Sequence, residues 1–397
     1  MIHLTILGRS LSSARPLRLA FPNCLENLSL SPQAAMAKTP RKTSATDLKK
    51  TVAKIDSQIL DLLAKRVNAC QKIVQNAPSL TIEQQLSSEE SELAKWLSSN
   101  KTPLAKESLS PVMQEILSLC RSASRRLRVA YLGPQYSYSH QAAVEKFGAN
   151  ADYSPVATIA AVFEEIQRNQ ADFGLVPVEN SNDGRVTDTL EMFAKVPTKI
   201  CGEVKLHIHH QLLAKCPREE IREVFSKPQA LSQCRNWLAK HLPAARPIEM
   251  TSTAAAAQLA AQKEGAAAVA SRAAGLNYNL ETIASNIEDN PNNITRFAVI
   301  SHSTAPKTGN DKTALLFQTE HKPGALADAM NIFKKNRLNL TWIESFPVAN
   351  SPEEYLFFVE MEGHSSELKI RRMIASLEKK TLRLEILGSY QKTEPVN

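Results

Sequence analysis

The sequence predicts a multidomain protein with an all-α domain, a two-lobed α/β domain and a small α/β domain at the C-terminal end. At roughly 100 to 200 residues per domain, 397 residues suit two to four domains. Glycine is absent between Gly8 and Gly133, and the pattern of strands and helices changes twice further along the chain. We expect an N-terminal arm over 1–43 that is disordered or misannotated, followed by domains over 44–127, 128–302 and 312–390.

Composition and charge exclude several classes of function. No apolar run approaches the roughly 18 to 20 residues of a membrane-spanning helix, so we expect no membrane association. The net charge of +8 is concentrated in residues 1–50, where eight Lys or Arg oppose Glu26 and Asp47, a balance of +6. Basic charge on a terminal arm is typical of a solvated tail, so nucleic-acid binding is not expected.

The cysteines and histidines do not form a metal-binding pattern. Six scattered cysteines contain no Cys-x-x-Cys pair, so we expect reduced thiols in the cytoplasm and no metal or cofactor. His207, His209 and His210 come closest to a cluster, but their spacing suits a strand with alternating faces. The basic N-terminal segment leaves a targeting peptide open, but we favour either an alternative start at Met36 or a disordered arm.

Residues 44–127 are predicted to be helical. Apolar residues from Val52 to Ile73 recur at spacings of three and four, the period of one helical face, and Pro78 ends this helix. Its length of about 45 Å is too great for its apolar stripe to be buried against one compact domain. We therefore expect a dimerising three-helix unit. The two further helices are predicted over Glu83–Leu97 and Pro111–Leu127.

Short strands and helices alternate over residues 128–302, which predicts two α/β lobes with a cleft between them, as in periplasmic binding proteins. The expected strands are Val129–Leu132, Phe173–Val178, Glu203–Leu206, Gln211–Leu213, Ala266–Ala270 and Ala298–Ser301. The expected helices are Ser139–Phe147, Ile159–Gln167, Asp188–Phe193, Gln229–Leu238 and Thr253–Ala261.

The last segment has the order βαββαβ, which is the ferredoxin-like motif, after a linker over Ser303–Asp311. Its strands are expected at Thr313–Thr319, Leu338–Ser345, Tyr355–Glu362 and Leu382–Leu387, and its helices at Gly324–Lys335 and Glu367–Leu377.

Six groups of residues, each weak alone, follow one another in a specific order. They are VAYLGPQYSYSHQAA (129–143), GLVPVENSNDGRVTDTL (174–190), SKPQALSQC (226–234), STAAAA (252–257), NITRF (293–297), and PGAL with ESFP (323–326 and 344–347). Together they resemble the prephenate dehydratase family, in the form fused to an N-terminal chorismate mutase helical domain and a C-terminal ACT domain. The resemblance covers residues 46 to about 390.

The resemblance implies that the chain converts prephenate into phenylpyruvate, carbon dioxide and water in phenylalanine biosynthesis. Such a site binds two carboxylates and assists the departure of hydroxide. Thr295 matches the catalytic threonine of the family, since a hydroxyl can donate to the leaving oxygen without placing a carboxylate near a dianion. Arg296 either binds a carboxylate or orders the loop, and Phe297 completes the motif. Alone, Asn293–Phe297 would be a loop entering the next strand.

The other motifs supply predicted substrate-binding residues. Asn180 and Ser181 can donate to the carboxylates, while Glu179 orients its neighbours at a strand end, where α/β folds place ligand contacts. Ser226 and Gln233 match polar site residues, but Lys227 stands where the family has histidine. Three further predicted contacts come from the two remaining motifs.

The first of them is Ser137, which follows Tyr136 where the family has glycine. Because tyrosine adopts positive φ only at a cost, this turn is expected to differ locally or never to have needed that conformation. Ser252 and Thr253 form either an anion site at a helix N-terminus or a simple cap.

The resemblance also carries a chorismate mutase site, which this sequence matches only in part. Lys49, Arg66 and Ser118 align with its polar residues, and chorismate is the implied second substrate. Ala77 stands where the family has lysine, and Glu89 where it has arginine. A carboxylate at about 4 Å repels a substrate carboxylate by roughly 4 kcal/mol at an effective dielectric near 20. We therefore expect weak or absent mutase activity from a fold kept for dimerisation.

The C-terminal domain resembles ACT domains that bind phenylalanine between subunits, so we expect an effector site and a homodimer or homotetramer. Phe346 replaces an arginine of the family there, which predicts weakened or altered effector binding. An ACT domain that only dimerises, and a non-catalytic protein that senses an aromatic metabolite, are the alternatives. The predicted effector residues are Gly324, Ala325, Leu326, Glu344 and Ser345.

Overall fold

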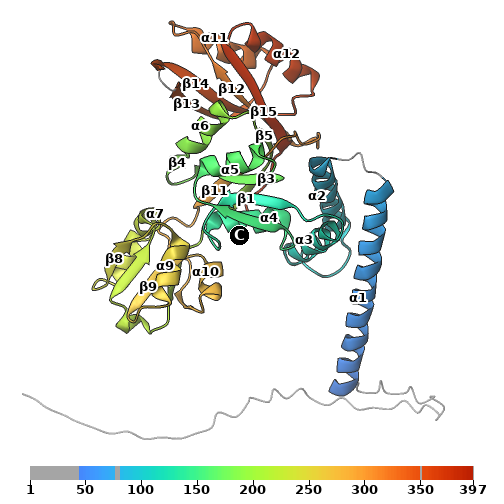
Figure 1. Ribbon diagram of the computed structural model, residues 1–397, viewed down its shortest axis with the longest axis vertical. Helices are drawn as coiled ribbons and strands as arrows, with labels where there is room; N and C mark the ends of the chain where they lie inside the picture. The colour runs from blue at the N-terminus through green and yellow to red at the C-terminus, as the bar shows by residue number, and fades with distance from the viewer. Residues whose placement is uncertain (1–43, 77–80, 349–350, 397) are drawn as a thin grey trace, which may run out of the picture. The chain divides into compact units, whose positions relative to one another are not determined.

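A computed structural model describes residues 44–76, 81–348 and 351–396 of the chain (Figure 1). The predicted arm over 1–43, including Met36, and the predicted helix end at Pro78 lie outside these residues. The chain divides into two units, 1–57 and 58–397, and each is considered by itself. None of the helices described is both long and apolar enough to cross a membrane.

Three helices come first: α1 (Ala45–Asn76), α2 (Ile82–Ser99) and α3 (Lys106–Ser122). The helical prediction for this segment is confirmed, but α3 begins and ends earlier than expected. Thr81 caps α2, because its hydroxyl accepts from the N–H of Gln84 and the Gln84 side chain accepts from the N–H of Thr81. Such reciprocal bonds satisfy two N–H groups that a helix start leaves unpaired.

The first lobe is built on one sheet with the strand order β2-β1-β3-β11-β5, in which β4 (Gly184–Arg185) pairs with β3. Strands β1, β2 and β3 are parallel, and β11 runs antiparallel between β3 and β5. Helix α4 (Tyr138–Phe147) covers one face of the sheet, and α5 (Ile159–Gln167) and α6 (Thr187–Lys195) cover the other. The strand bounds are Arg128–Leu132 for β1, Asp152–Val156 for β2, Phe173–Asn180 for β3, Lys199–His207 for β5 and Ile294–Ser301 for β11.

The second lobe has its own sheet, in the order β10-β6-β9-β7-β8. The chain passes between the lobes twice, after β5 and before β11, so a cleft forms where the two crossings meet. The bounds are Gln211–Ala214 for β6, Glu223–Ser226 for β7, Arg246–Glu249 for β8, Ala266–Ala270 for β9 and Glu281–Ala284 for β10. Its helices are α7 (Pro228–Gln233), α8 (Arg235–His241), α9 (Thr253–Ala260) and α10 (Arg272–Asn277).

The helix predicted over Gln229–Leu238 is in fact two, α7 (Pro228–Gln233) and α8 (Arg235–His241). Cys234 leaves the helical conformation between them, with φ −114° and ψ 13°. The carboxylate of Asp289 then accepts from the N–H groups of Asn236 and Trp237. This distant cap satisfies the start of α8 and makes the break stable.

The C-terminal domain has the predicted order βαββαβ, and its antiparallel sheet runs β13-β14-β12-β15, the ferredoxin-like arrangement. Residues of β12 alternate between two buried faces: Leu315 and Phe317 pack with the helices, whereas Ala314 and Leu316 face the first lobe. The bounds are Asp311–Gln318 for β12, Ala325–Lys335 for α11, Leu340–Val348 for β13, Ser351–Glu362 for β14, Leu368–Glu378 for α12 and Arg383–Gln391 for β15.

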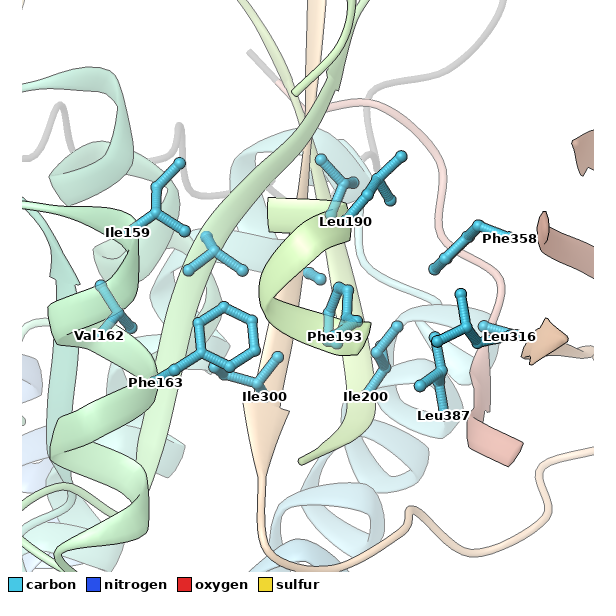
Figure 2. Close-up of a cluster of buried hydrophobic side chains, with 14 of the residues drawn as sticks. Ile159, Val162, Phe163, Leu190, Phe193, Ile200, Ile300, Leu316, Phe358 and Leu387 are labelled. Carbon is cyan, nitrogen blue, oxygen red and sulfur yellow. The ribbon is translucent and has the colours of Figure 1, made fainter. Parts of the chain in front are cut away.

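The first lobe and the C-terminal sheet share one apolar core (Figure 2). Figure 2 labels Phe163 of α5 and Phe193 of α6 in the same cluster as Leu316 and Phe358 of the C-terminal sheet. The ring centroids of Phe193 and Phe358 lie 6.2 Å apart. Because a common core removes apolar surface of both domains from water, the two domains stabilise each other.

The backbones of β15 and β5 pack closely together at this junction. A Cβ atom added at Gly388 of β15 would collide with the carbonyl oxygen of Ile200 in β5. We expect Gly388→Ala to lower the free energy of unfolding by about 1–3 kcal/mol, because backbone atoms cannot yield as a side chain can. Gly202→Ala, also in β5, is the control, since its added Cβ would meet no atom closer than 3.4 Å. Equal urea midpoints for the two variants would contradict this expectation.

Candidate active site between the two lobes

A polar cleft lies between the two lobes, at the crossings of the chain. Both lobes contribute side chains, and the Asn293–Phe297 segment supplies Thr295 and Phe297. The strand here was expected to begin at Ala298, but the structure shows that Ile294–Phe297 already belongs to β11. Other side chains that line the cleft are Ser137, Tyr138, Asn180, Asp183, Arg185, Asp188, His210, Lys227, Gln229, Gln233, Ser252 and Thr253.

Asn180 and Thr295 face each other across neighbouring strands. They are direct partners in the register of β3 and β11, and Asn180 Nδ2 donates to Thr295 Oγ1 at 2.7 Å. The Asn180 amide is oriented from its other side, since Oδ1 accepts from the N–H groups of Asn182 and Asp183 at 2.9 and 3.2 Å. Thr295 therefore accepts this hydrogen bond and keeps its own proton for a group in the cleft.

Gln233 connects the two lobes through a chain of amide hydrogen bonds. Its Oε1 accepts from Asn293 Nδ2 at 3.0 Å and pairs with His210 Nε2 at 2.9 Å. Its Nε2 donates to Asp183 Oδ2 at 3.0 Å, from the second lobe to the first. Asn293 in turn accepts from Asn180 at 3.1 Å. With both its amide atoms engaged, Gln233 holds the site together rather than standing free for a ligand.

His210 lies in the middle of this network. It is buried, and burial lowers the pKa of its imidazole below the usual value near 6.5. Its Nδ1 lies 2.8 Å from the hydroxyl of Tyr138, whose own pKa is raised well above the usual range by burial. The neutral imidazole donates through Nε2 to Gln233 and accepts through Nδ1, so it transmits no net charge to the cleft.

Arg296 points away from the cleft, because neighbouring residues of a strand face opposite sides. Its Nη2 donates to Glu360 at 2.7 Å, and its guanidinium lies 4.5 Å from the centre of the Trp342 ring. Its Nη1 lies 3.4 Å from the carboxylate of Glu179. Arg296 is thus paired within the protein, which favours the ordering role over the binding of a substrate carboxylate.

The other predicted substrate residues are divided between cleft and framework. Ser137 and Ser252 line the cleft, and each also caps a helix by accepting a backbone N–H at 3.3 and 3.0 Å. Ser181 instead links β3 to the next crossing, since its hydroxyl accepts from Ile294 N–H at 2.9 Å. The buried hydroxyl of Ser226 donates to the carbonyl of Val269 at 2.6 Å, so this serine is part of the sheet and not of the cleft lining.

The turn before α4 corrects a further expectation. Because Tyr136 stands where the family has glycine, this turn was expected to do without a positive φ. Tyr136 nevertheless adopts a φ of 65°. A non-glycine residue in this region costs about 1–2 kcal/mol. Contacts of the Tyr136 ring with His140 and Tyr278, at centroid distances of 5.6 and 6.2 Å, help to offset this cost.

In unit 58–397, the residues aligned with a mutase site are engaged in contacts within the protein. Arg66 lies 3.3 Å from the carboxylate of Glu92, and its Nη1 donates to Cys120 Sγ at 2.8 Å. The buried hydroxyl of Ser118 accepts from the N–H of Asn150 in the first lobe at 3.1 Å. Glu89 pairs with Arg121, although burial raises its pKa. Lys49 is an exposed residue of α1 in the unit 1–57, and Ala77 lies outside the described residues.

Sequence reasoning missed Asp183, Arg185 and His210 as parts of the site. Asp183 and Arg185 flank Gly184, and a glycine there predicts a turn but does not show which side chains the flanking residues contact. His210 was considered only as a strand residue. No cluster of His, Cys, Asp and Glu suitable for a metal ion occurs in the described part of the chain.

A two-lobed α/β domain with a polar cleft at its crossings defines a class of ligand-binding and enzyme domains. Residues 129–305 match the family model described as prephenate dehydratase. A bifunctional chorismate mutase/prephenate dehydratase of Aquifex aeolicus is 41% identical and covers 87% of this chain and 97% of its own length. One from Stutzerimonas stutzeri is 35% identical with the same coverage. The chain belongs to the family of bifunctional chorismate mutase/prephenate dehydratases.

A solved structure supports the same assignment. It is the prephenate dehydratase of Arthrobacter aurescens in complex with L-phenylalanine, at 30% identity and a TM-score of 0.63. The similarity covers 66% of this chain and 89% of that one.

The lowered pKa of His210 predicts how stability depends on pH. Unfolding restores the imidazole pKa to about 6.5, so the unfolded chain binds more protons below this pH. The contribution of His210 to stability is therefore complete above pH about 6.5 and falls as the pH drops through the lower folded value. We expect urea midpoints from pH 7.5 to 5 to decrease less steeply in His210→Gln than in the unsubstituted protein. Parallel profiles would contradict this assignment.

Proposed function

We propose that the chain dehydrates and decarboxylates prephenate to phenylpyruvate in the cleft between the lobes. The observation that carries the proposal is the hydrogen bond from Asn180 to Thr295, which leaves the threonine proton directed to the cleft. The family to which the chain belongs supplies the reaction. The bond from the ring to the carboxylate breaks, its electron pair enters the ring, and the ring hydroxyl departs as the ring becomes aromatic.

Thr295 assists the step in which charge develops on the departing oxygen. A hydrogen bond from its hydroxyl stabilises this oxygen as it leaves, and the oxygen becomes water on gaining a proton. The threonine itself carries no charge, so it does not repel a dianionic substrate, as a carboxylate would. In this proposal Asn180 positions Thr295, while Ser137, Ser252 and Thr253 offer hydroxyl groups to the substrate.

Replacing Thr295 tests this role. We expect Thr295→Val, which keeps the shape but removes the hydroxyl, to lower kcat for phenylpyruvate formation by about 10²- to 10⁴-fold. Thr295→Ser keeps the hydroxyl and should retain kcat within about tenfold, on the same basis. The melting temperatures of both variants should be measured beside the kinetics. A folded Thr295→Val protein with unchanged kcat would remove Thr295 from the mechanism.

We further propose that the C-terminal domain is an ACT domain that binds phenylalanine and reports it to the cleft. Support comes from a pocket lined by Pro323 and by two of the predicted effector residues, Ala325 and Leu326. Glu344, another predicted effector residue, forms a 2.8 Å ion pair with Arg185, which lines the cleft. Phe346, where the family has arginine, is buried in the core shared with the first lobe and packs there instead of offering a charge.

The helical domain is proposed as a dimerisation module with little mutase activity. Ile59, Leu62 and Ile73 of α1 are 49%, 63% and 63% exposed, so their apolar surface favours a cover from a second copy of the chain. We propose a homodimer or homotetramer. We also propose that the protein is cytoplasmic, because disulfides are rare in that reducing compartment and the described cysteines are free. The domains proposed are those expected from the sequence, over 44–127, 128–302 and 312–390.

Chorismate provides the test of the helical domain. We expect turnover of chorismate at less than about one hundredth of the prephenate rate, because Glu89, paired with Arg121, offers no positive charge to a substrate carboxylate, and Arg66 and Ser118 are bound within the protein. Both substrates should be assayed with one purified preparation, so that protein quality is the same. Comparable rates for the two would refute the proposal of an eroded mutase site.

A further inference from the structure

Lys227 occupies a place at the cleft that the mechanism above does not use. It directly precedes α7, is exposed, and lines the cleft together with Asn180 and Thr295. Gln229, two residues further on, donates across the cleft to the carboxylate of Asp183 in the first lobe. This end of α7 therefore faces the first lobe, and the flexible stem of Lys227 can bring its ammonium to a ligand held between the lobes.

The charges of the cleft single out this lysine. The charged side chains of the lining, apart from histidine, are Asp183, Arg185, Asp188 and Lys227, two cations and two anions that sum to zero. Arg185 is held by Glu344 at 2.8 Å. Asp183 accepts from two amides of α7, and Asp188 lies in the first turn of α6, where negative charge is favoured. Lys227 has no ion pair within the described residues, so its charge is available to a ligand.

We propose that Lys227 binds a carboxylate of the substrate and makes the cleft selective for the dianionic keto acid. This inference rests on the proposed function and assigns a specificity-determining residue to it. Prephenate carries two carboxylates and a net charge of −2. Its 2-amino analogue, arogenate, carries the same carboxylates with an ammonium in place of the keto oxygen, a net charge of −1. The dianion gains more than the monoanion from a cation in the cleft.

The experiment compares both substrates in one set of variants. Lys227→Ala changes the charge of the lining from 0 to −1, so we expect KM for prephenate to rise about 10- to 100-fold with kcat within about threefold, the size of one lost charge-assisted hydrogen bond. KM for arogenate should rise by about tenfold less. Lys227→Arg keeps the charge and should restore the preference. The control is Lys240→Ala, an exposed lysine of α8 outside the cleft lining, which should leave both KM values unchanged.

Each result distinguishes this inference from the proposed function. If Lys227→Ala and Lys240→Ala have the same KM for prephenate, or if Lys227→Ala affects both substrates equally, the role of Lys227 is overturned while the dehydratase function stands. An unsubstituted protein that prefers arogenate would also overturn it. An unsubstituted protein that converts neither substrate would overturn the proposed function itself. Melting temperatures of all variants separate a loss of binding from a loss of folding.

Discussion

The alternation of side chains along β11 is the constraint on which the rest of the structure depends. Two adjacent residues of an extended strand must face opposite sides of the sheet. Thr295 therefore reaches the cleft while Arg296 reaches the C-terminal sheet. Because β11 is hydrogen-bonded to β3 on one side and to β5 on the other, neither side chain can shift far without moving the whole sheet. One short segment of β11 thus connects the candidate active site to the C-terminal domain.

Arg296 belongs to a buried group of charges that makes this junction specific. Lys312 lies 2.6 Å from Glu203 and 3.3 Å from Glu360, and Glu360 also accepts from Arg296 and from the hydroxyl of Tyr390. Burial would raise the pKa of Glu203, but Lys312 and the other partners lower it overall. Breaking such a group leaves a buried charge without a partner, at a cost of about 3–5 kcal/mol. A change in the position of Glu360 in the C-terminal sheet therefore also affects Arg296 in β11.

The sequence predicts the apolar elements of this fold well and its exposed, polar ones poorly. Helix α5 and strand β9 have the predicted bounds, because a helical apolar period marks the first and a continuous apolar run of five residues marks the second. Strand β2, also five residues long, was missed because it is partly exposed and contains Pro155. The break between α7 and α8 was missed as well, since it depends on the carboxylate of Asp289, which lies 53 residues from one of its partners. The pattern of residues in a short stretch of sequence cannot reveal a contact between residues so far apart in the chain.

The same distinction applies within the site. Thr295 and Asn180 were proposed from local motifs, whereas Asp183 and His210 enter only through contacts with Gln233, 50 and 23 residues away in sequence. Motifs also cannot give the direction of a hydrogen bond. In the folded chain two backbone N–H groups fix the Asn180 oxygen, and only then must its amide nitrogen donate to Thr295. A hydroxyl that already accepts can offer its proton outward, and this makes a threonine, which has no charge to lose, suited to a dianionic ligand.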